Sequence, residues 1–430
     1  MGKEVLDVCI VGGGMITHDL ILPSIYHLQR TGKIGHIDIC ALNNAPLRAL
    51  KESPELTTAF PHRNFIAWPS FDQPPERNFP VLYRDVLAAL PPYQAVIVAV
   101  PDQFHYDVVM TALRCRQHVL CVKPLVLRYS QAAEIARFAY ERGLFVGVEY
   151  HKRFDRRALL ARRQYRNGDF GAFMLGEARM IEPYRYRCSN FQNWFTADQT
   201  DPFVYVGCHY VDLVWFITGL RPTAVSVSGC RGKFPNGKEG YMWTNGRIRY
   251  ENGALLSVSD GLGYPDAGAG SNDQGLVMYC EGADRGGLIR HDDQYRGVDH
   301  CYLDLLGGTG SQYNYVNPDF YRLVSWDGPG LQPVGYGFDS IAAIIAVMRK
   351  IETAADGLAP EEAHTVRQQM IRDTEARGLI ATPGNSSINE LVIEAGRASI
   401  SHDGEWVDIG YDPVPSVRLR QDTIEVAEDD

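Results

Sequence analysis

The sequence predicts an α/β protein with two domains: a doubly wound parallel sheet at the N-terminus, followed by an α+β domain with an open, mainly antiparallel sheet. Two observations lead to this fold class. Residues 1–149 alternate short apolar runs with segments of helical spacing, whereas the strands expected in residues 150–412 alternate polar and apolar side chains. A chain of 430 residues is also longer than one ordinary core requires. Residues 413–430 are charged and are expected to form a poorly ordered tail.

The N-terminal domain is predicted from continuously apolar strands. Strands that are buried on both faces lack inside–outside alternation, and they are typical of parallel sheets with helices on both sides. This is the Rossmann arrangement. The predicted strands cover residues 6–11, 37–42, 95–100, 118–122 and 145–149, and the predicted helices cover residues 17–30, 104–116 and 130–142.

The second domain is predicted to mix helices with an antiparallel sheet, because stretches such as "GALLSVSD" alternate in polarity. Its strands are expected at residues 174–180, 223–231, 243–250, 254–260 and 275–281, and its helices at 153–167, 205–219, 339–356, 361–378 and 386–399. Residues 261–337 are rich in Gly, Asp and Tyr, and we expect long loops there that cover a site.

Composition narrows the possible partners and the compartment. The net charge of −10 argues against nucleic acid as the main partner, because phosphate binding needs a positive field. We expect no membrane partner, since no run approaches 18 apolar residues and the N-terminus lacks a signal peptide. The nine cysteines form no Cys-x-x-Cys pair, and no cluster has metal-ligand spacing. We therefore expect free thiols, a cytoplasmic location and no metal.

The first strand runs into the glycine-rich stretch "VGGGMIT", which fits G-x-G-x-x-G except that Thr17 takes the third glycine position. Gly12 would make the tight turn, and Gly14 would let the backbone approach a pyrophosphate at the helix N-terminus. The alternative is a plain structural turn. Within the strand–helix alternation we favour dinucleotide binding. The predicted contacts are Gly12, Gly13, Gly14, Met15 and Ile16.

The end of the second strand bears on the choice between NAD and NADP. Rossmann domains usually place an acidic residue there to bind the ribose hydroxyls, but this chain has Asn43 and Asn44. Asn43 can still bind a hydroxyl group, and Arg48 would either meet a 2′-phosphate or lie in solvent. We therefore favour NAD and leave NADP open.

The stretch "AVIVAVPDQFHYDVVMTALRCRQHVLCVKPL" resembles the glucose–fructose oxidoreductase / inositol dehydrogenase (Gfo/Idh/MocA) family. In that family a strand ends in a Pro-Asn/Asp-x-x-His turn, and the next strand ends in Glu-Lys-Pro. The likeness continues at residues 148–155, 207–222 and 378–400, and Val122 departs from it by replacing the usual Glu. The matching residues, which the resemblance places at the cofactor, are Pro101, Asp102, His105, Lys123 and Pro124.

The resemblance implies an NAD(P)-dependent oxidoreductase that acts on a secondary alcohol or ketone of a sugar, sugar derivative or cyclitol. It also implies a homo-oligomer, a dimer or tetramer formed through the C-terminal sheet. Two alternatives stay open. One is a glycoside hydrolase that uses bound NAD for transient oxidation and elimination, and the other is a cofactor-sensing protein without turnover.

Three residues are predicted to be catalytic. Lys123 follows the strand at 118–122, so it would stand at the carboxyl edge of the sheet, where desolvation would favour its basic form. Tyr205, His209 and Asp212 would share one face of a helix. The family often has Asp-x-x-x-His here, so Tyr205 stands at the Asp position and a hydroxyl would orient the substrate. The alternative for His209 is core packing.

Further substrate contacts are expected at His151, which follows a strand, and in the segment "YRYRCSNFQNWF". Aromatic side chains stack on sugar rings, and arginines bind hydroxyl or acidic groups. Core packing explains such aromatics about equally well. The predicted substrate-binding residues are Lys123, His151, Tyr184, Arg185, Trp194, Tyr205, His209 and Asp212.

Overall fold

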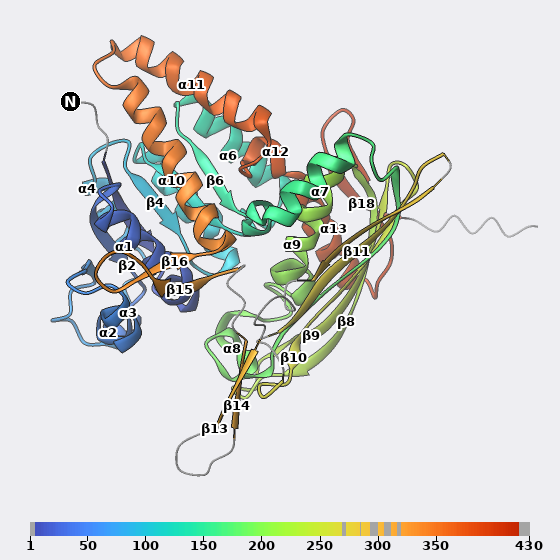
Figure 1. Ribbon diagram of the computed structural model, residues 1–430, viewed down its shortest axis with the longest axis horizontal. Helices are drawn as coiled ribbons and strands as arrows, with labels where there is room; N and C mark the ends of the chain where they lie inside the picture. Colours follow the sequence, from blue (N-terminus) through green and yellow to red (C-terminus); the bar gives the residue numbers. More distant parts are fainter. Residues whose placement is uncertain are drawn as a thin grey trace, which may run out of the picture.

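The computed structural model describes residues 5–268, 272–283, 285–292, 300–304, 311–315 and 320–420 (Figure 1). The first of its two large sheets has six parallel strands in the order β3-β2-β1-β4-β5-β6, which confirms the doubly wound prediction. The short strand β3 is absent from the prediction because its three residues include two exposed ones. The strands are β1 (Leu6–Val11), β2 (Ile34–Cys40), β3 (Ile66–Trp68), β4 (Ala95–Val98), β5 (His118–Val122) and β6 (Val146–Glu149).

Helices cover both faces of this sheet. One face packs on α4 (Leu82–Ala89), α5 (His105–Arg114) and α6 (Tyr129–Glu141). The other packs on α1 (Leu22–Arg30) and on α10 (Tyr336–Ala355), to which α11 (Pro360–Arg377) is joined. The outer edge carries α2 (Ala45–Glu52) and α3 (Pro54–Ala59).

Helices α10 and α11 follow most of the strands of the second sheet in the chain, yet they lie beside the first sheet and complete the first domain (Figure 1). Gly147 of β6 permits the close approach, because a Cβ there would lie 2.8 Å from Cγ2 of Ile344. The sequence boundaries place both helices in the second domain. Spatially they belong to the first sheet, because the apolar face of α10 covers strands that lie about 200 residues earlier in the chain.

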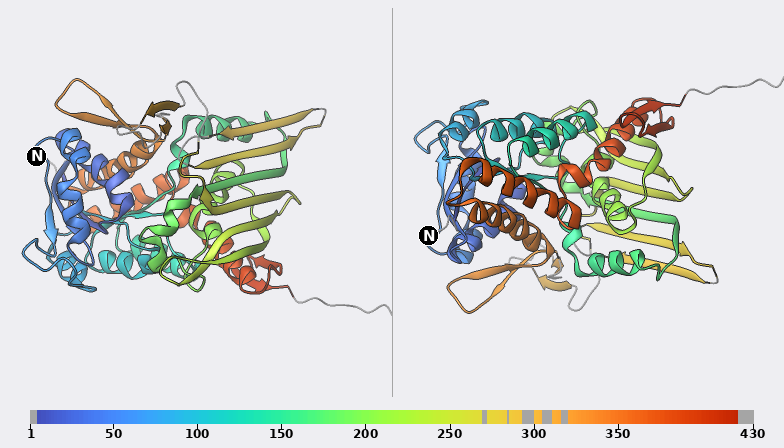
Figure 2. Two further views of the ribbon diagram at one scale, coloured as in Figure 1. Left: turned by 90° about the horizontal axis from the view of Figure 1, so that it is seen from below. Right: turned by 90° about the horizontal axis from the view of Figure 1, so that it is seen from above.

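The second sheet has eight strands in the order β12-β11-β7-β10-β9-β8-β17-β18, and β7 and β10 form its one parallel pair among the described strands. One face packs on α7 (Arg156–Arg166), α9 (Cys208–Thr218) and α13 (Ile388–Ile400), on the side of the first domain (Figure 2). The strands are β7 (Ala172–Pro183), β8 (Pro222–Lys233), β9 (Glu239–Tyr250), β10 (Leu255–Tyr264), β11 (Asp273–Glu281), β12 (Gly286–Asp292), β17 (Val407–Gly410) and β18 (Ser416–Leu419).

Two regions contain more strand than the sequence predicts. The expected loops at 261–337 include β12 and two local hairpins, and the expected tail begins with β18. Short strands that pair with a neighbour close in sequence carry little apolar periodicity, so the pattern does not reveal them. The hairpin strands are β13 (His300–Asp304), β14 (Ser311–Tyr315), β15 (Arg322–Ser325) and β16 (Leu331–Val334).

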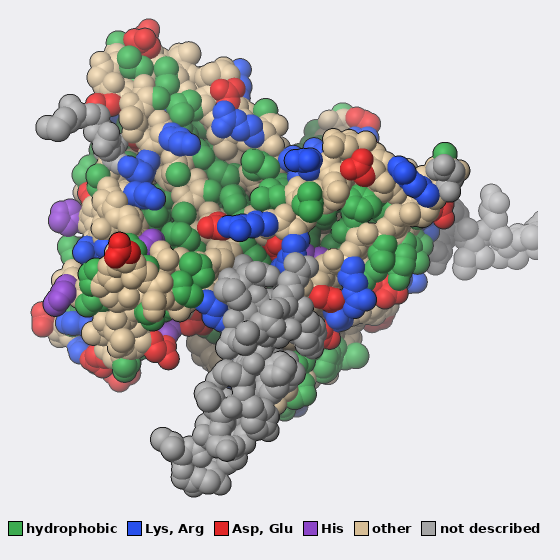
Figure 3. Space-filling view, viewed as in Figure 1, with side chains coloured by type: hydrophobic (Ala, Val, Ile, Leu, Met, Phe, Trp, Pro, Cys, Tyr) green, Lys and Arg blue, Asp and Glu red, His purple; other side chains and the backbone are tan. Residues whose placement is uncertain are grey.

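Helix hydropathy, surface charge and the cysteines are as follows in the described part of the chain. Among the described residues, none of the helices has the length and apolar character needed to cross a bilayer. On the face seen in Figure 3, basic and acidic side chains are interspersed and do not gather in one basic patch. Eight cysteines are free thiols: Cys9, Cys40, Cys115, Cys121, Cys188, Cys208, Cys230 and Cys280.

Candidate active site

The glycine-rich turn after β1 leaves open space at Gly14. Gly12 has a φ of +123°, and a Cβ there would lie 2.0 Å from the backbone oxygen of Ala99, so only glycine fits. A Cβ at Gly14 would meet no atom within 4 Å. The helix begins at Met15, and the amides of its first turn lack intrahelical acceptors. The turn therefore fits a pyrophosphate, with room at Gly14 and amide donors beside it.

Thr17 closes this turn in place of the third glycine. Its hydroxyl donates a 2.8 Å hydrogen bond to the carbonyl of Gly12, and the side chain is buried. Gly13 packs more closely than Gly14, since a Cβ there would lie 3.4 Å from side chains of α2. Met15 is exposed and Ile16 is half-buried, so both flank the open space at the start of the helix.

The asparagines after β2 have different surroundings. Asn44 is buried and donates to the carbonyls of Ser70 and Gln73, so it holds a loop together. Asn43 is half-buried and donates to Asn78 at 2.9 Å. Arg48 bonds to the carbonyl of Phe71 and to the side chain of Asn44. The Arg48 guanidinium is therefore already engaged by the protein.

The Pro-Asp-x-x-His turn is held by a buried histidine. His105 lies 2.7 Å from the carbonyl of Pro124 through Nδ1 and 2.8 Å from that of Val100 through Nε2. This ring ties the end of β4 to the loop after β5, beside Pro101. Asp102 is buried, and burial raises the pKa of its carboxyl, opposed by the charges of His105 and Lys123 and a hydrogen bond from Thr200. His105 thus has a structural role at this edge of the sheet, because both of its ring nitrogens contact backbone carbonyls.

Lys123, Tyr205 and His209 come together at the carboxyl edge of β5. Lys123 Nζ donates to the carbonyl of Tyr205 and lies 3.8 Å from the centroid of its ring. Tyr205 belongs to a π-helical turn, Phe203–Gly207, directly before α9. The positive charge of His209 is opposed first by burial and then by Lys123, His151 and Lys152, so its pKa lies well below 6.5. His209 is therefore neutral at neutral pH, and its Nδ1 has no partner in the described part of the chain.

His151 lies against His209, with ring centroids 4.5 Å apart. Its ring also contacts Phe320 at 4.9 Å and Tyr336 at 5.6 Å. Nδ1 of His151 is 3.1 Å from each carboxylate oxygen of Glu149, the last residue of β6. Two imidazoles therefore stand side by side next to Lys123.

The other predicted substrate contacts divide into a buried ion pair and an aromatic group. Asp212 is buried and accepts hydrogen bonds from Arg153 Nε at 2.8 Å and from Asn389 at 2.8 Å, so the protein already satisfies its carboxylate. Trp194 packs 5.6 Å from Tyr205 and 5.0 Å from Phe191. The aromatic group thus forms one wall behind Tyr205.

Tyr184 and Arg185 lie outside this wall. Both are exposed, and the backbone amide of Arg185 donates to Asp266 at 2.9 Å. The guanidinium of Arg187 covers the ring of Tyr184 at 4.7 Å.

Three buried charged residues near the site escape the sequence prediction: Glu149, Lys152 and Glu182. Lys152 Nζ donates to Gln274 at 2.7 Å. Burial raises the pKa of Glu182, opposed by a hydrogen bond from Asn272 and by the charges of Lys123, Lys152 and Arg185. The sequence signal for Glu149 is an acidic residue that ends a continuously apolar strand. Such a residue must face a partner or an opening at the sheet edge.

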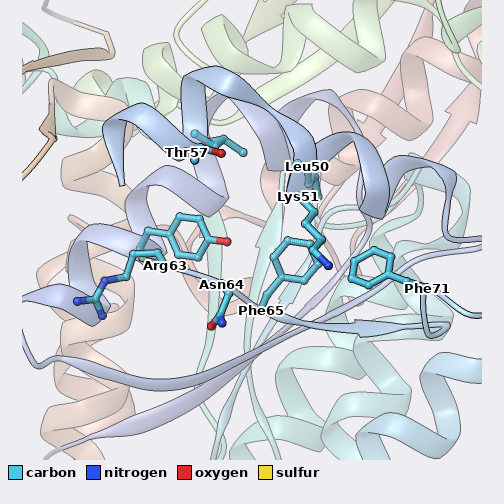
Figure 4. A pocket seen from close by; sticks show the side chains of 9 residues that line it. Leu50, Lys51, Thr57, Arg63, Asn64, Phe65 and Phe71 are labelled. Atoms are coloured by element: carbon cyan, nitrogen blue, oxygen red, sulfur yellow. The ribbon is translucent and has the colours of Figure 1, made fainter. Parts of the chain in front are cut away.

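A separate cavity of about 150 Å³ lies beside α1, α2 and α3 (Figure 4). None of the predicted site residues lines it. Its side chains are Tyr26, Leu50, Lys51, Leu56, Thr57, Arg63, Asn64, Phe65 and Phe71. Within the described ranges no group of three His, Cys, Asp or Glu side chains has the geometry of a metal site.

Known proteins share this architecture. An oxidoreductase of Schizosaccharomyces pombe is 33% identical over 132 residues, which are 30% of this chain and 34% of that protein. D-glucoside 3-dehydrogenase of Escherichia coli is 26% identical over 267 residues, which are 61% of this chain and 66% of that protein. The matches thus span less than two thirds of either relative.

A solved structure gives the same fold over nearly the whole chain. The scyllo-inositol dehydrogenase of Lactobacillus casei with bound NAD(H) and scyllo-inositol superposes with a TM-score of 0.60 at 14% identity, covering 94% of this chain and 99% of that one. Residues 6–150 match an oxidoreductase family with an NAD-binding Rossmann fold, and residues 158–280 match the GFO/IDH/MocA C-terminal domain. The chain therefore belongs to the Gfo/Idh/MocA oxidoreductase family, and its N-terminal domain is that family's NAD-binding Rossmann fold.

Proposed function

We propose that the protein is an NAD(P)-dependent oxidoreductase that transfers hydride between a nicotinamide cofactor and a secondary alcohol or ketone of a sugar, sugar derivative or cyclitol. One observation carries the proposal: Lys123 meets Tyr205 and His209 of the second domain at the carboxyl edge of the first sheet. Ligands of open α/β sheets bind at this edge. The substrate class is supported by relatives whose names denote a glucoside and an inositol.

We assign Lys123 and His209 to the reacting C–O group and Tyr205 to the ring that carries it. Lys123 contacts the carbonyl and the ring face of Tyr205, and both contacts suit an ammonium group. We therefore assign Lys123 as the donor to the substrate oxygen. His209 is neutral through burial, so it forms a hydrogen bond with the hydroxyl without adding charge. Tyr205 and Trp194 form an apolar wall for the sugar or cyclitol ring. The cofactor supplies the hydride acceptor when bound.

A substrate screen tests the reaction class. Polyols, aldoses, glycosides and inositols are incubated with NAD or NADP, and absorbance is followed at 340 nm. We expect stoichiometric reduced cofactor from a free polyol or sugar. Aglycone release without net NADH would instead support a glycoside hydrolase, and tight cofactor binding without turnover would support a sensor.

Substitutions at the two central side chains test their roles. We expect Lys123→Met and His209→Asn each to lower kcat by about 10²–10³-fold while NADH binding persists, since this is the typical cost of removing a hydrogen-bonding group from the reacting oxygen. Near wild-type turnover of the identified substrate in both variants would contradict the assignment.

The cofactor position is tested at Gly14. Gly14→Val places a side chain in open space, so the fold should tolerate it while the pyrophosphate loses its room. We expect weaker NADH binding in a fluorescence titration. Gly410→Val is the matched control, because Gly410 ends the distant strand β17 and a Cβ there would meet only Ser416 Oγ, at 3.8 Å. Equal NADH affinity in both variants would refute the placement.

We favour NAD over NADP because Arg48 is engaged by Phe71 and Asn44 and is not free to meet a 2′-phosphate. Asn43→Asp should sharpen the preference for NAD by repelling that phosphate. Equal loss of both cofactors, or a shift toward NADP, would show that Asn43 does not bind the ribose.

We also propose a cytoplasmic location, since the described thiols are free.

We propose that two copies associate through the outer face of the second sheet. Leu255, Leu175, Tyr279 and Leu288 are exposed and lie directly opposite one another across β10, β7, β11 and β12. Such a continuous apolar row is typical of an interface. Leu175→Asp should reduce the particle mass in sedimentation experiments, whereas Val81→Asp, at an exposed residue outside the sheet, should not. A monomeric wild-type protein would contradict the proposal.

A further inference from the structure

The site contains an acid–base pair that the family resemblance does not assign. Strand β6 ends at Glu149, and His151 follows two residues later. Because Val122 of β5 pairs with Glu149, Lys123 and His151 leave neighbouring strands at the same edge of the sheet. Glu149 is 2% exposed and His151 is 8% exposed, so solvent does little to screen their interaction.

The contact fixes the tautomer of His151. Its Nδ1 is 3.1 Å from both Oε1 and Oε2 of Glu149. A carboxylate only accepts hydrogen bonds, so Nδ1 carries the proton and Nε2 keeps its lone pair. Within the described part of the chain, no donor or acceptor is found for Nε2. The ring therefore offers one unprotonated nitrogen beside His209 and Lys123.

The charges around the two imidazoles differ in one respect. Lys123 and Lys152 both disfavour a proton on His209, and burial does so more strongly. No carboxylate bonds to His209, whose Nδ1 is unpartnered among the described residues. His151 instead has the Glu149 carboxylate 3.1 Å from its Nδ1, placed to face the positive ring that forms when Nε2 takes up a proton. We therefore assign the substrate proton to His151.

We propose that His151 is a catalytic base and that Glu149 is its positioning residue, an inference that rests on the oxidoreductase function proposed above. In alcohol oxidation the substrate O–H bond breaks and an N–H bond forms at Nε2 of His151. The electron pair of the C–H bond leaves with hydride for the dinucleotide, and the C–O bond becomes C=O. Glu149 holds the imidazolium until it returns the proton to water.

Ring packing alone gives a different expectation. His151 contacts Phe320 and Tyr336, so an aromatic side chain without nitrogen would satisfy the same packing. His151→Phe separates the two explanations because it keeps a ring and removes Nε2. We expect kcat to fall by about 10²–10⁴-fold with unchanged NADH affinity. If His151→Phe does not fold, His151→Gln replaces it in the same assay.

Two substitutions separate the charge of Glu149 from its hydrogen bond. Glu149→Gln keeps an acceptor oxygen but removes the charge, and Glu149→Leu removes both. We expect both variants to lose kcat with little change in KM. Long-range ¹H–¹⁵N spectra of the ligand-free protein then report the tautomer of His151. The Nδ1–H form should persist in the wild type and in Glu149→Gln, and it should become a mixture in Glu149→Leu.

The control is another buried histidine bonded to a glutamate, His118 with Glu352, at the opposite end of β5. His118→Phe should lower stability without lowering kcat per folded molecule. Wild-type kcat in His151→Phe, or an unchanged tautomer in Glu149→Leu, would overturn the pair. Failure of the 340 nm screen would overturn the oxidoreductase function instead, and the tautomer measurement is independent of that screen.

Discussion

Two buried glutamates in different parts of the molecule have pKa values shifted in opposite directions, although burial raises both. Glu352 of α10 is 3% exposed and accepts from Arg367 at 2.7 and 2.8 Å and from His118 at 2.9 Å. Although burial opposes it, these bonds and charges lower the pKa of Glu352 to about 2. Glu390 of α13 is fully buried, and no described side chain bonds to it. Burial raises its pKa to about 8, opposed by backbone amides that include those of Leu125 and Val126.

The difference shows where this fold compensates charge. Behind the first sheet, where α10 and α11 dock, the buried ions are paired, so removing one partner would leave the other charge uncompensated. Next to the site, burial dominates: Glu390 contacts the loop that follows Lys123 and is neutral at neutral pH, and so is His209. Burial thus keeps these two groups next to the site in their uncharged forms, and perturbed pKa values of this kind are common at catalytic centres.

The largest expected effect is a pH-dependent one at Glu390. Because its folded pKa is raised, the folded state holds a proton that the unfolded chain loses above pH 4.5. This stabilisation is complete below pH 4.5 and is lost as pH rises through 8, a change of about 5 kcal/mol. Glu390→Gln should match the wild type near pH 5 and be more stable near pH 9 in urea unfolding. If the free energies of unfolding of the two proteins changed in parallel with pH, burial would not raise the pKa of Glu390, and the contrast with Glu352 would fail.

Glu352 should show the opposite sign. Its lowered pKa means that the stabilisation is present above pH 4.5 and is lost as pH falls toward 2. Glu352→Gln should cost about 3 kcal/mol at pH 7, because Arg367 stays buried without its counter-charge. Urea unfolding at pH 7 and at pH 3 measures both effects. A loss that is independent of pH would show that packing, and not the ion pair, holds α10 to α11.

A neutral hydrogen bond should contribute less than either charged group. Thr17→Val removes the buried bond from the hydroxyl to the Gly12 carbonyl, and we expect a loss of about 1 kcal/mol. Thr57→Val is the matched control, since that hydroxyl makes a 2.8 Å bond to the carbonyl of Ser53 but lies on the exposed side of α3. Thermal unfolding of both variants tests the expectation, and equal losses would contradict it.

The parts that the sequence predicted well are those in which local pattern and tertiary role coincide. Continuously apolar strands and the turn at Gly12 reflect burial on both faces and one backbone constraint, and both are visible within a few residues. The docking of α10 on the first sheet is not visible locally. It depends on Gly147 and Ile344, which are far apart in the sequence.

In the site, too, features that local sequence pattern reveals differ from features that depend on residues distant in the sequence. Lys123 directly follows β5 and His209 lies on α9, positions that the sequence predicts by motif and helical spacing, while their roles stay predictions. Asp212 lies on the predicted helix, but helical spacing could not reveal Arg153 as its partner. Glu149 and Glu390 were missed because a lone carboxylate in an apolar segment has no sequence signature for its partner or its charge state.

An exposed ion pair should contribute the least to the free energy of unfolding of the charged groups compared here. Arg137 and Glu141 of α6 are four residues apart, 3.3 Å between Nη1 and Oε1, with side chains 66% and 50% exposed. Solvent screens the attraction, and a basic residue before the acidic one is the less favourable order on a helix. Glu141→Gln should therefore change the free energy of unfolding by less than about 0.5 kcal/mol. A loss in urea unfolding as large as that of Glu352→Gln would mean that pairing alone, without burial, accounts for the stabilisation at Glu352.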